Sequence, residues 1–437
     1  MEKKTEKPEH NSPSQKNGII RIGYACLAVA VPDTDIRSCI LRNANEARLL
    51  ALIDHNLSAL ETMIDYNIRN GIKLYRISSD LIPFGSSVAI HLPWAEAFSE
   101  RLAAIGLKVR DSGMRVSMHP GQYTVLNSPD SAIADRAVED LCYHTRVLDS
   151  MGLDASHKII LHIGGAYGDK KFAAQRFVAR FADMDTHIRR RIVLENDDSL
   201  FDIADVLETA STVGLPVVYD NLHNAVNSAD SEKTDAYWIR ECAGTWIESD
   251  GTQKVHYSQQ HPNRKPGAHS ESVMIDAFLD FFAGLGDLKP DIMLEVKDKN
   301  LSAIKCLLCT QNRGIGALEA EWARYKYSVL EKSPGTYNEI RAMLCDKSSY
   351  PAVPFYHMTE HALRQPRDMG HAANALQHVW GYLKDAATET EKKNFSIRLE
   401  AYSSGDAPLE ELKRMLQRLA VKYRCGYLLD SYYFDIG

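Results

Sequence analysis

The sequence predicts a (β/α)8 barrel followed by a separate all-helical module. Short runs of β-branched and aliphatic residues recur eight times between residues 19 and 296. The segments between these runs carry apolar residues at three- and four-residue steps, as amphipathic helices do. Continuous apolar strands are typical of parallel sheets that helices cover on both faces, and eight strand–helix repeats of this kind favour a closed barrel.

The runs that predict strands are spaced by roughly one helix and one strand. They are IIRIGYA (19–25), IKLYRIS (72–78), MRVSMH (114–119), KIILHI (158–163), RIVLEN (191–196), PVVYDN (216–221), KVHYSQ (254–259) and DIMLEV (291–296). A doubly wound open sheet is the alternative arrangement of such repeats. The first strand is not followed by the G-x-G-x-x-G fingerprint of that fold, so the barrel is favoured.

Three helix-like segments within this region, 47–71, 130–152 and 199–214, end on a glycine. Glycine is common just beyond the end of a helix because it adopts the left-handed backbone conformation without strain. These segments therefore predict helices that return the chain to the start of the next strand.

After about residue 300 only helical patterns follow, and they include LEAEWARYKYSVLEK, GHAANALQHVWGYLKDA and APLEELKRMLQRLAVKYRC. The first 18 residues are polar and rich in Lys, Glu, Pro and Ser, a composition typical of disorder. We therefore expect a disordered tail over 1–18, a barrel domain over 19–310 and a helical domain over 311–437.

Composition excludes a membrane protein and a secreted one. The chain has 437 residues, of which 45% are hydrophobic, and no segment approaches the roughly 20 consecutive apolar residues of a spanning helix. Residues 1–18 lack the apolar centre of a secretory signal. The eight cysteines are scattered without a disulfide framework, which is typical of a reducing cytoplasm. Cys306 and Cys309 form the closest pair; with no second pair behind them, buried thiols are expected rather than a zinc site.

Residues able to bind a metal stand at, or just beyond, the carboxyl ends of the predicted strands. They are His119, His162, Glu195, Asp220, His223, His256, His269 and Glu295. In a barrel these ends meet at one mouth, which is the face that builds active sites. Singly, each histidine could be a hydrogen-bonded core residue and Glu195 could pair with an arginine. As a set, so many partly buried polar and acidic groups require cations.

Mixed nitrogen and oxygen donors suit Mn²⁺, Zn²⁺ or Fe²⁺, while the lack of thiolates argues against a closed structural zinc site. With eight candidate ligands more than one ion is expected, and clustered divalent ions are the usual apparatus of phosphodiester hydrolysis. The net charge of −7 does not suggest a nucleic-acid binder, but metal ions over an acidic cluster reverse the local sign.

An ordered set of motifs resembles the UV damage endonucleases, with a match from about residue 20 to 300. These motifs are GYA (23–25), SMHPGQY (117–123), LHIGGAYGDK (161–170), LENDD (194–198), DNLHNA (220–225), KVHYSQQ (254–260) and PGAH (266–269). The resemblance implies a metal-dependent barrel enzyme of DNA repair. Its substrate would be damaged double-stranded DNA carrying cyclobutane pyrimidine dimers, 6-4 photoproducts or other lesions such as abasic sites. It would cut the phosphodiester bond immediately 5′ of the lesion.

The resemblance also implies roles for individual residues. The eight candidate ligands match a cluster of up to three ions, commonly including manganese, with Zn²⁺ and Mg²⁺ as the other candidates. Glu195, Lys254 and His256 are the expected catalytic residues, and Lys254 matches a lysine that can be carboxylated. Gln122 and Tyr123 match a pair that probes the duplex, and Tyr24 a residue that helps to hold extruded nucleotides.

The motif HPGQY would then combine a ligand with a probe, because Gly121 allows a tight turn between His119 and the exposed amide and phenol. A planar phenol can stack in the gap that extruded bases leave. The alternative is that Tyr123 packs on the barrel rim. Basic residues near the mouth are candidates for phosphate contacts, namely Arg264 and Lys265 in PNRKPG, with Lys170 and Lys171.

Two departures from the family pattern leave the lesion range and the third metal's ligands open. Ala28 stands where some members have an asparagine that acts at the lesion. Ser87 stands where some have a further histidine, with His91 close by.

The last third of the chain resembles a bacterial helical domain of unknown function, through WARYKYSVL, NALQHVWGYL and LLDSYYF. Its histidines, His357, His361, His371 and His378, suggest either a second metal site or structural and exposed positions, and the second interpretation is favoured. The module would extend the grip on DNA or bind a repair partner.

Two other functions fit parts of the pattern. Sugar isomerases and epimerases also carry Glu, Asp and His metal sites at a barrel mouth, but need only one or two ions and no loop that probes a duplex. A damage-binding protein without catalysis would not need the full ligand set.

Overall fold

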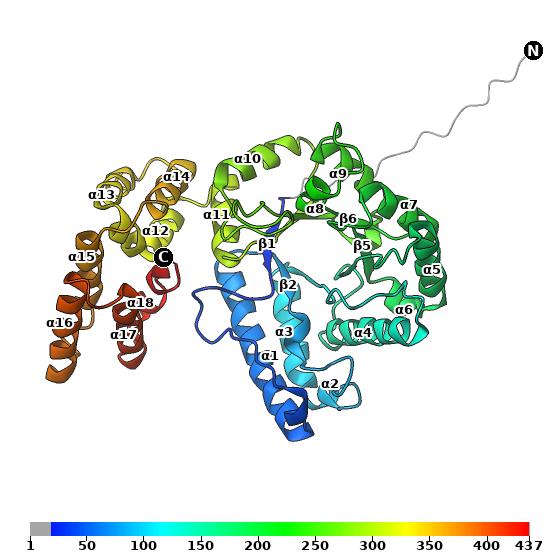
Figure 1. Cartoon of the computed structure of the whole chain (residues 1–437), viewed down its shortest axis with the longest axis horizontal. Helices are drawn as coiled ribbons and strands as arrows, with labels where there is room; N and C mark the ends of the chain where they lie inside the picture. The colour runs from blue at the N-terminus through cyan, green and yellow to red at the C-terminus, as the bar shows by residue number, and fades with distance from the viewer. Residues whose placement is uncertain (1–18, 437) are drawn as a thin grey trace, which may run out of the picture.

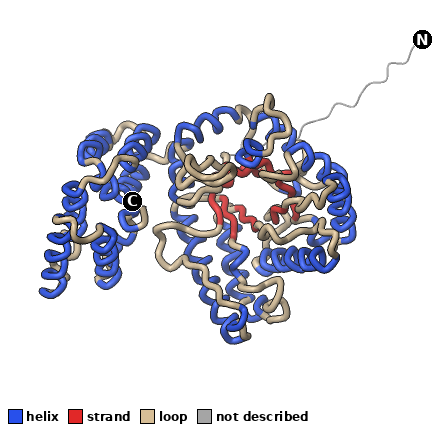
Figure 2. Tube along the Cα trace, viewed as in Figure 1, coloured by secondary structure: helices blue, strands red, loops and turns tan. Residues whose placement is uncertain are grey.

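A computed structural model describes residues 19–436 and confirms the predicted (β/α)8 barrel. Eight parallel strands pair in chain order, and β8 closes the barrel against β1. Figure 2 shows the strands as a central ring inside a ring of helices, with the remaining helices beside it. The predicted disordered tail, 1–18, lies outside the described residues.

Each strand falls inside the run that predicted it. The strands are β1 (Ile22–Ala25), β2 (Leu74–Ile77), β3 (Arg115–Met118), β4 (Ile159–Leu161), β5 (Ile192–Glu195), β6 (Val217–Asp220), β7 (Lys254–Tyr257) and β8 (Asp291–Leu294). All are short, and nearly every strand residue is buried, because the barrel interior covers one face and the helices cover the other.

The helices around the barrel include the three that the glycine stops predicted. They are α1 (Glu46–Arg69), α2 (Trp94–Ala97), α3 (Ser99–Asp111), α4 (Ser131–Ser150), α5 (Lys170–Asp183), α6 (Thr186–Arg189), α7 (Ile203–Val213), α8 (Asn221–Val226), α9 (Asp235–Ala243), α10 (Ile275–Gly284) and α11 (Asn300–Thr310). Gly214 ends α7 with a φ of 69°, the left-handed conformation that glycine adopts without strain. Asp202 and Asp205 form a capping box at the other end of the same helix.

The C-terminal module is helical, as predicted, and lies beside α11 (Figure 1). It consists of α12 (Ile315–Lys332), α13 (Pro334–Met343), α14 (Ala352–Leu363), α15 (Met369–Trp380), α16 (Glu389–Ser403), α17 (Leu409–Lys422) and α18 (Gly426–Leu429). A second hydrophobic core joins α15, α16 and α17, whereas buried residues of α13 and α14 join a core that is continuous with that of the barrel. Helix α12 contributes to both cores, with Tyr327 and Leu330 in the second. The first half of the module is therefore built onto the barrel.

A buried ion pair fastens this half to the barrel. Glu360 of α14 lies 2.8 Å from the ammonium of Lys305 in α11, and Lys305 is only 3% exposed. The same carboxylate oxygen accepts a hydrogen bond from the backbone N–H of Ile275, where α10 begins. Glu360 thus gives Lys305, whose ammonium also donates to Ser272 and Val273, a negatively charged partner, and it satisfies the backbone N–H of Ile275.

No helix within residues 19–436 has both the length and the apolarity to cross a bilayer. The two cysteines of the Cys-x-x-Cys motif lie on α11 as free thiols, Cys306 buried and Cys309 half-buried. Burial raises the pKa of both thiols, to about 12 for Cys309, which fits the interpretation as protonated core residues.

Removing one partner of the buried pair should destabilise the whole protein. Glu360→Ala leaves the Lys305 ammonium buried without a counter-charge, a change that costs about 3–5 kcal/mol in comparable pairs. We expect urea denaturation to report a free energy of unfolding lower by about that amount.

The double variant Lys305→Met with Glu360→Leu should recover most of the loss, because apolar residues of similar volume often replace buried pairs without cost. Arg240→Ala, which removes the largely exposed pair with Asp287, is the matched control and should leave stability unchanged. A single variant Glu360→Ala as stable as the wild type would show that the pair does not fasten the module.

Candidate metal centre

The carboxyl ends of the strands deliver the predicted ligands to one rim of the barrel. Glu195 and Asp220 are the last residues of β5 and β6, and His256 is the third residue of β7. The other candidates follow strand ends or lie in the loops beyond them, namely His119, His162, His223, His269 and Glu295. The closed barrel therefore places them around a common centre.

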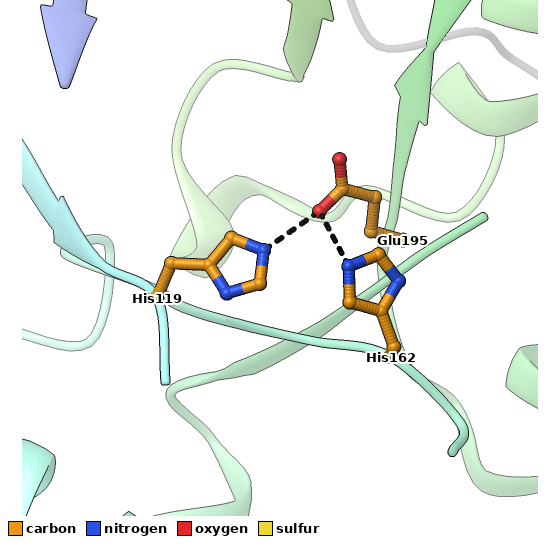
Figure 3. Close-up of side chains that lie close together, drawn as sticks. All are labelled: His119, His162 and Glu195. Atoms are coloured by element: carbon orange, nitrogen blue, oxygen red, sulfur yellow. Dashed lines mark hydrogen bonds and ion pairs between the residues drawn. The ribbon is translucent and has the colours of Figure 1, made fainter. Parts of the chain in front are cut away.

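Glu195 occupies that centre and is 1% exposed. Its Oε2 lies 3.0 Å from Nε2 of His119 and 3.6 Å from Nε2 of His162, as Figure 3 shows. Its Oε1 lies 2.6 Å from Nδ1 of His256 and 3.9 Å from Nδ1 of His223. One carboxylate thus faces four imidazoles, which is the geometry of a bridging ligand.

Three groups of side chains within the described residues are compact enough to hold a cation, and all contain Glu195. These groups are His119 with His162, Asp220 with His223, and His256 with Glu295. His269 lies further out, with its Nε2 3.9 Å from Oε2 of Glu295. Seven of the eight predicted ligands therefore converge, and the eighth approaches from the loop after β7.

The acidic groups at this centre are buried close together, and each changes the pKa of its neighbours. Burial alone would raise the pKa of Glu195, but the imidazoles, His256 above all, hold it well below its usual range. Burial and the charges of Glu195 and Glu295 raise the pKa of Asp220 despite the neighbouring His223. Although burial lowers it, Asp220 and Glu195 raise the pKa of His223 to about 9. The carboxylates therefore compete for positive charge.

Several buried atoms of the candidate ligands have no hydrogen-bond partner, which is expected of atoms that bind a cation. Oδ2 of Asp220, Nε2 of His256 and Nδ1 of His162 are buried and have no hydrogen-bond partner. Buried polar atoms in this state are costly unless they bind an ion or a water molecule. Carboxylate and imidazole donors in this mixture fit divalent cations such as Mn²⁺ and Zn²⁺.

Neighbouring residues fix the ligands in place. The side chain of Asn196 exchanges two hydrogen bonds with the backbone of Asp220, and the backbone oxygen of Asn196 lies 2.8 Å from Nδ1 of His223. Asp220 also accepts a hydrogen bond from the backbone N–H of His223 and so caps α8. The Asp-x-x-His spacing is therefore the cap of a helix as well as a ligand pair.

A second network lies beneath His119. The hydroxyl of Ser79 donates to the backbone oxygen of His119 at 2.7 Å, and Nε2 of the buried His144 lies 2.9 Å from the same hydroxyl. Thr124, at the end of the HPGQY loop, donates to Asp140 at 2.6 Å. Helix α4 thereby holds both the ligand and the loop that follows it.

Arg76 is a site residue that the sequence analysis missed. It lies in β2 and forms an ion pair with Glu295, and each side chain is 12% exposed. Glu295 keeps a pKa below its usual range although burial raises it, because Arg76 opposes that effect. A charged residue inside the apolar run IKLYRIS was the signal that could have revealed it.

The HPGQY loop presents its probe residues to solvent. Gln122 is exposed and Tyr123 is 73% exposed, so Tyr123 does not pack into the rim. The expected turn is present, since the backbone N–H of Thr124 donates to the backbone oxygen of Gly121 at 2.9 Å, and Gly121 has a second role. A Cβ at this position would lie 2.6 Å from the ring of Tyr123, so glycine leaves room for the ring to lie against the backbone.

Tyr24 does not lie where the sequence analysis expected it. It has no exposed surface, and its hydroxyl donates to Oδ1 of Asn67 in α1 at 2.9 Å. Its ring packs edge-on against Tyr75, 5.2 Å between centroids. In this conformation Tyr24 joins the barrel wall to α1 and offers no face to an extruded nucleotide.

Lys254 is fully buried at the start of β7, and its ammonium nitrogen has no hydrogen-bond partner. Arg264 and Lys265 are exposed at the tip of a hairpin that the bridge between Gln260 and His269 closes. Lys170 forms an ion pair with Asp205, and the guanidinium of Arg264 lies 3.7 Å from the carboxylate of Glu271.

The positions that depart from the family pattern add no ligand to the cluster. Ser87 and His91 are exposed in the loop after β2, and neither belongs to the three compact groups. Ala28 is half-buried in the loop after β1. The four histidines of the C-terminal module, His357, His361, His371 and His378, are exposed, as the favoured interpretation expected.

Two family models and several known proteins match this chain. A family model described as UV-endonuclease UvdE matches residues 20–320, and one described as a protein of unknown function, DUF1722, matches residues 326–436. The chain is 35% identical to a UV DNA damage endonuclease of Clostridium perfringens over 91% of this chain and 97% of that protein. It is 28% identical to one from Bacillus cereus, over 66% and 94%.

Among solved structures, the crystal structure of SacUVDE is similar, with a TM-score of 0.62 and 33% identity over 66% of this chain and 96% of that one. The resemblance stated from the motifs is thereby confirmed, and it extends into the C-terminal module through the relative from Clostridium perfringens. The chain belongs to the UV-endonuclease UvdE family.

Proposed function

We propose that this protein is a cytoplasmic DNA repair endonuclease that cuts immediately 5′ of UV photoproducts, using several divalent metal ions. The observation that carries the proposal is the buried carboxylate of Glu195, shared by three ligand groups, next to a loop that presents an exposed amide and phenol. Cyclobutane dimers and 6-4 photoproducts are the expected lesions, and abasic sites are further candidates.

Up to three ions would be held, one by each group that Glu195 completes, with manganese as the first candidate and Zn²⁺ and Mg²⁺ as competitors. Ions held in this way activate water and stabilise the attacking and leaving oxygens of a phosphodiester. Glu195 bridges the groups, His256 orients it from β7, and Arg76 limits the excess negative charge by pairing with Glu295.

Recognition of the lesion would rest on the cost of unstacking. Photoproducts weaken stacking, so the damaged bases are extruded at lower cost than normal ones. The ring of Tyr123 would fill the gap and the amide of Gln122 would hydrogen-bond to the opposite bases. Arg264 and Lys265 at their hairpin tip, and the exposed Lys171 on α5, would contact phosphates.

The C-terminal module would widen the DNA-binding surface or bind a repair partner. Helices α15, α16 and α17 share the second core, and they lie on the side of the module away from the barrel (Figure 1). We place the functional boundary between the two parts near residue 310, at the end of α11.

A sugar isomerase or epimerase remains the alternative from the same fold. Such an enzyme would need one or two ions in an enclosed pocket. The exposed probe loop and the basic hairpin favour a duplex as substrate instead. A protein that only binds damage would not need seven converging ligands.

Removal of the shared charge should abolish incision. Glu195→Gln keeps the size of the side chain and neutralises it. We expect nicking of UV-irradiated plasmid with added Mn²⁺ to fall at least roughly a hundredfold, since even the outer partners of metal ligands are worth 10–100-fold. Bound metal, measured by elemental analysis, should fall as well.

Glu208→Gln, at an exposed position on α7, is the matched control and should keep full activity and metal content. Undiminished nicking after exhaustive chelation would contradict a metal-dependent reaction.

Loss of the Tyr123 ring should weaken discrimination more than binding in general. Stacking of a base on an aromatic side chain is worth roughly 1–3 kcal/mol. We expect Tyr123→Ala to lose that much affinity for a UV-damaged duplex, measured by fluorescence anisotropy, and little for an undamaged one. Tyr123→Phe should recover most of the loss, and equal losses for both duplexes would rule out a role in recognising damage.

Lys254 is proposed to carry a carboxyl group, as the family resemblance implies. Its complete burial without a hydrogen-bond partner supports a modified side chain, because a carbamate would bring an acceptor toward the metal groups. With ¹³C-labelled bicarbonate, NMR should show a carbamate carbon that is lost in Lys254→Met. The same spectrum from both proteins would exclude the modification.

A further inference from the structure

A second exposed tyrosine lies at the barrel mouth, in the loop between β4 and α5. Tyr167 follows the ligand His162 by five residues, and 48% of it is exposed. Its φ is +51°, in the left-handed region that bulky residues rarely adopt. A strained backbone under a solvent-exposed ring contributes nothing to the core, so stability does not explain it.

The ring of Tyr167 is seated in the same way as that of Tyr123. A Cβ on Gly165 would lie 2.8 Å from the Tyr167 ring, just as one on Gly121 would lie 2.6 Å from the Tyr123 ring. Each tyrosine therefore stands two residues after a glycine and lies against the backbone there. Each follows a metal ligand at the end of its strand, His119 after β3 and His162 after β4. Neighbouring strands thus carry two copies of one arrangement.

Two residues join these loops. The side-chain amide of Asn127, in the loop after β3, donates to the backbone oxygen of Gly165 at 2.8 Å. The guanidinium of Arg176 in α5 donates to the backbone oxygen of Asn127 and lies 5.3 Å from the centre of the Tyr167 ring. A cation over the ring restricts its orientation, while 48% of Tyr167 stays exposed to solvent. The two loops can therefore act on one ligand.

We propose that Tyr167 is a second aromatic contact to DNA, which stacks on a nucleotide of the damaged duplex beside the one that Tyr123 contacts. The inference rests on the proposed function and adds a specificity-determining residue to it. Aromatic faces stack on bases of any sequence. A second tyrosine would therefore favour duplexes in which a lesion has weakened the stacking of neighbouring bases. The backbone strain is then explained by the orientation that this contact requires.

Three variants test the proposal in the full-length protein. Tyr167→Ala removes the ring and should lower both affinity for a UV-damaged duplex and nicking of irradiated plasmid by roughly 5- to 150-fold, the range for one lost base–aromatic stack. Gly165→Ala displaces the ring without deleting it and should have the same effect. Tyr167→Phe keeps the ring and should recover most of the loss.

Two further readouts separate DNA contact from a structural role. Tyr167→Gly removes the ring and also relieves the left-handed backbone, so its Tm should equal or exceed that of the wild type while nicking falls. Metal content should stay at the wild-type level in every Tyr167 variant. A lower Tm, or lost metal, would overturn the proposal, because Tyr167 would then support the fold or His162.

The control is Ile247→Ala, which removes exposed apolar surface in the segment that leads into β7, at the opposite end of the barrel. It should change neither nicking nor affinity. If Tyr167→Ala nicks irradiated plasmid as well as the wild type, the inference about Tyr167 is wrong. If the wild type itself does not nick irradiated plasmid, the proposed function is what fails.

Discussion

The structure of the mouth depends on the charge balance around one buried carboxylate. Glu195 is enclosed by imidazoles and lies near two further carboxylates, Asp220 and Glu295. Carboxylates that lie close together repel strongly where water is excluded. The two neighbouring carboxylates are stabilised to different degrees. Arg76 neutralises one side, while Asp220 keeps an oxygen without a partner. The protein supplies an incomplete shell of donor atoms, and this shell fits divalent cations.

The barrel and most of the ligand set could be predicted from the sequence because one pattern encodes both. A parallel strand ends where its apolar run ends, and the next polar side chain necessarily faces the rim. Side-chain direction within a strand was harder to predict. In a barrel both faces of a strand are buried, so the pattern does not distinguish Tyr24, which turns outward to Asn67, from a residue that faces the mouth. Arg76 was missed because a charge in an apolar run marks an unusual position but does not identify its partner, Glu295, 219 residues away.

The division of the chain into domains shows a related limit. Amphipathic spacing after residue 300 predicts helices, but it does not say which surface each helix covers. Helix α14 packs against α10 and α11, where Lys305 pairs with Glu360, whereas α15, α16 and α17 share a second core to which α12 also contributes. Buried contacts therefore cross the boundary expected at residue 310, and a change of composition along the chain did not reveal them.

The two loops after β3 and β4 show how the fold separates rigidity from exposure. A residue that probes a duplex must lie in solvent, where packing cannot hold it, and yet must keep one orientation. Gly121 and Gly165 restrict the orientation of the two rings by letting each ring lie against the backbone. The hydrogen bond from the side chain of Asn127 to the backbone of Gly165 links the two loops. Because both loops begin at candidate metal ligands, a nucleotide stacked on either ring as proposed would also be fixed relative to the metal centre. In the proposed function, recognition of the lesion and cleavage would therefore depend on the same two loops, and displacing a ring by a single methyl group should disturb both together.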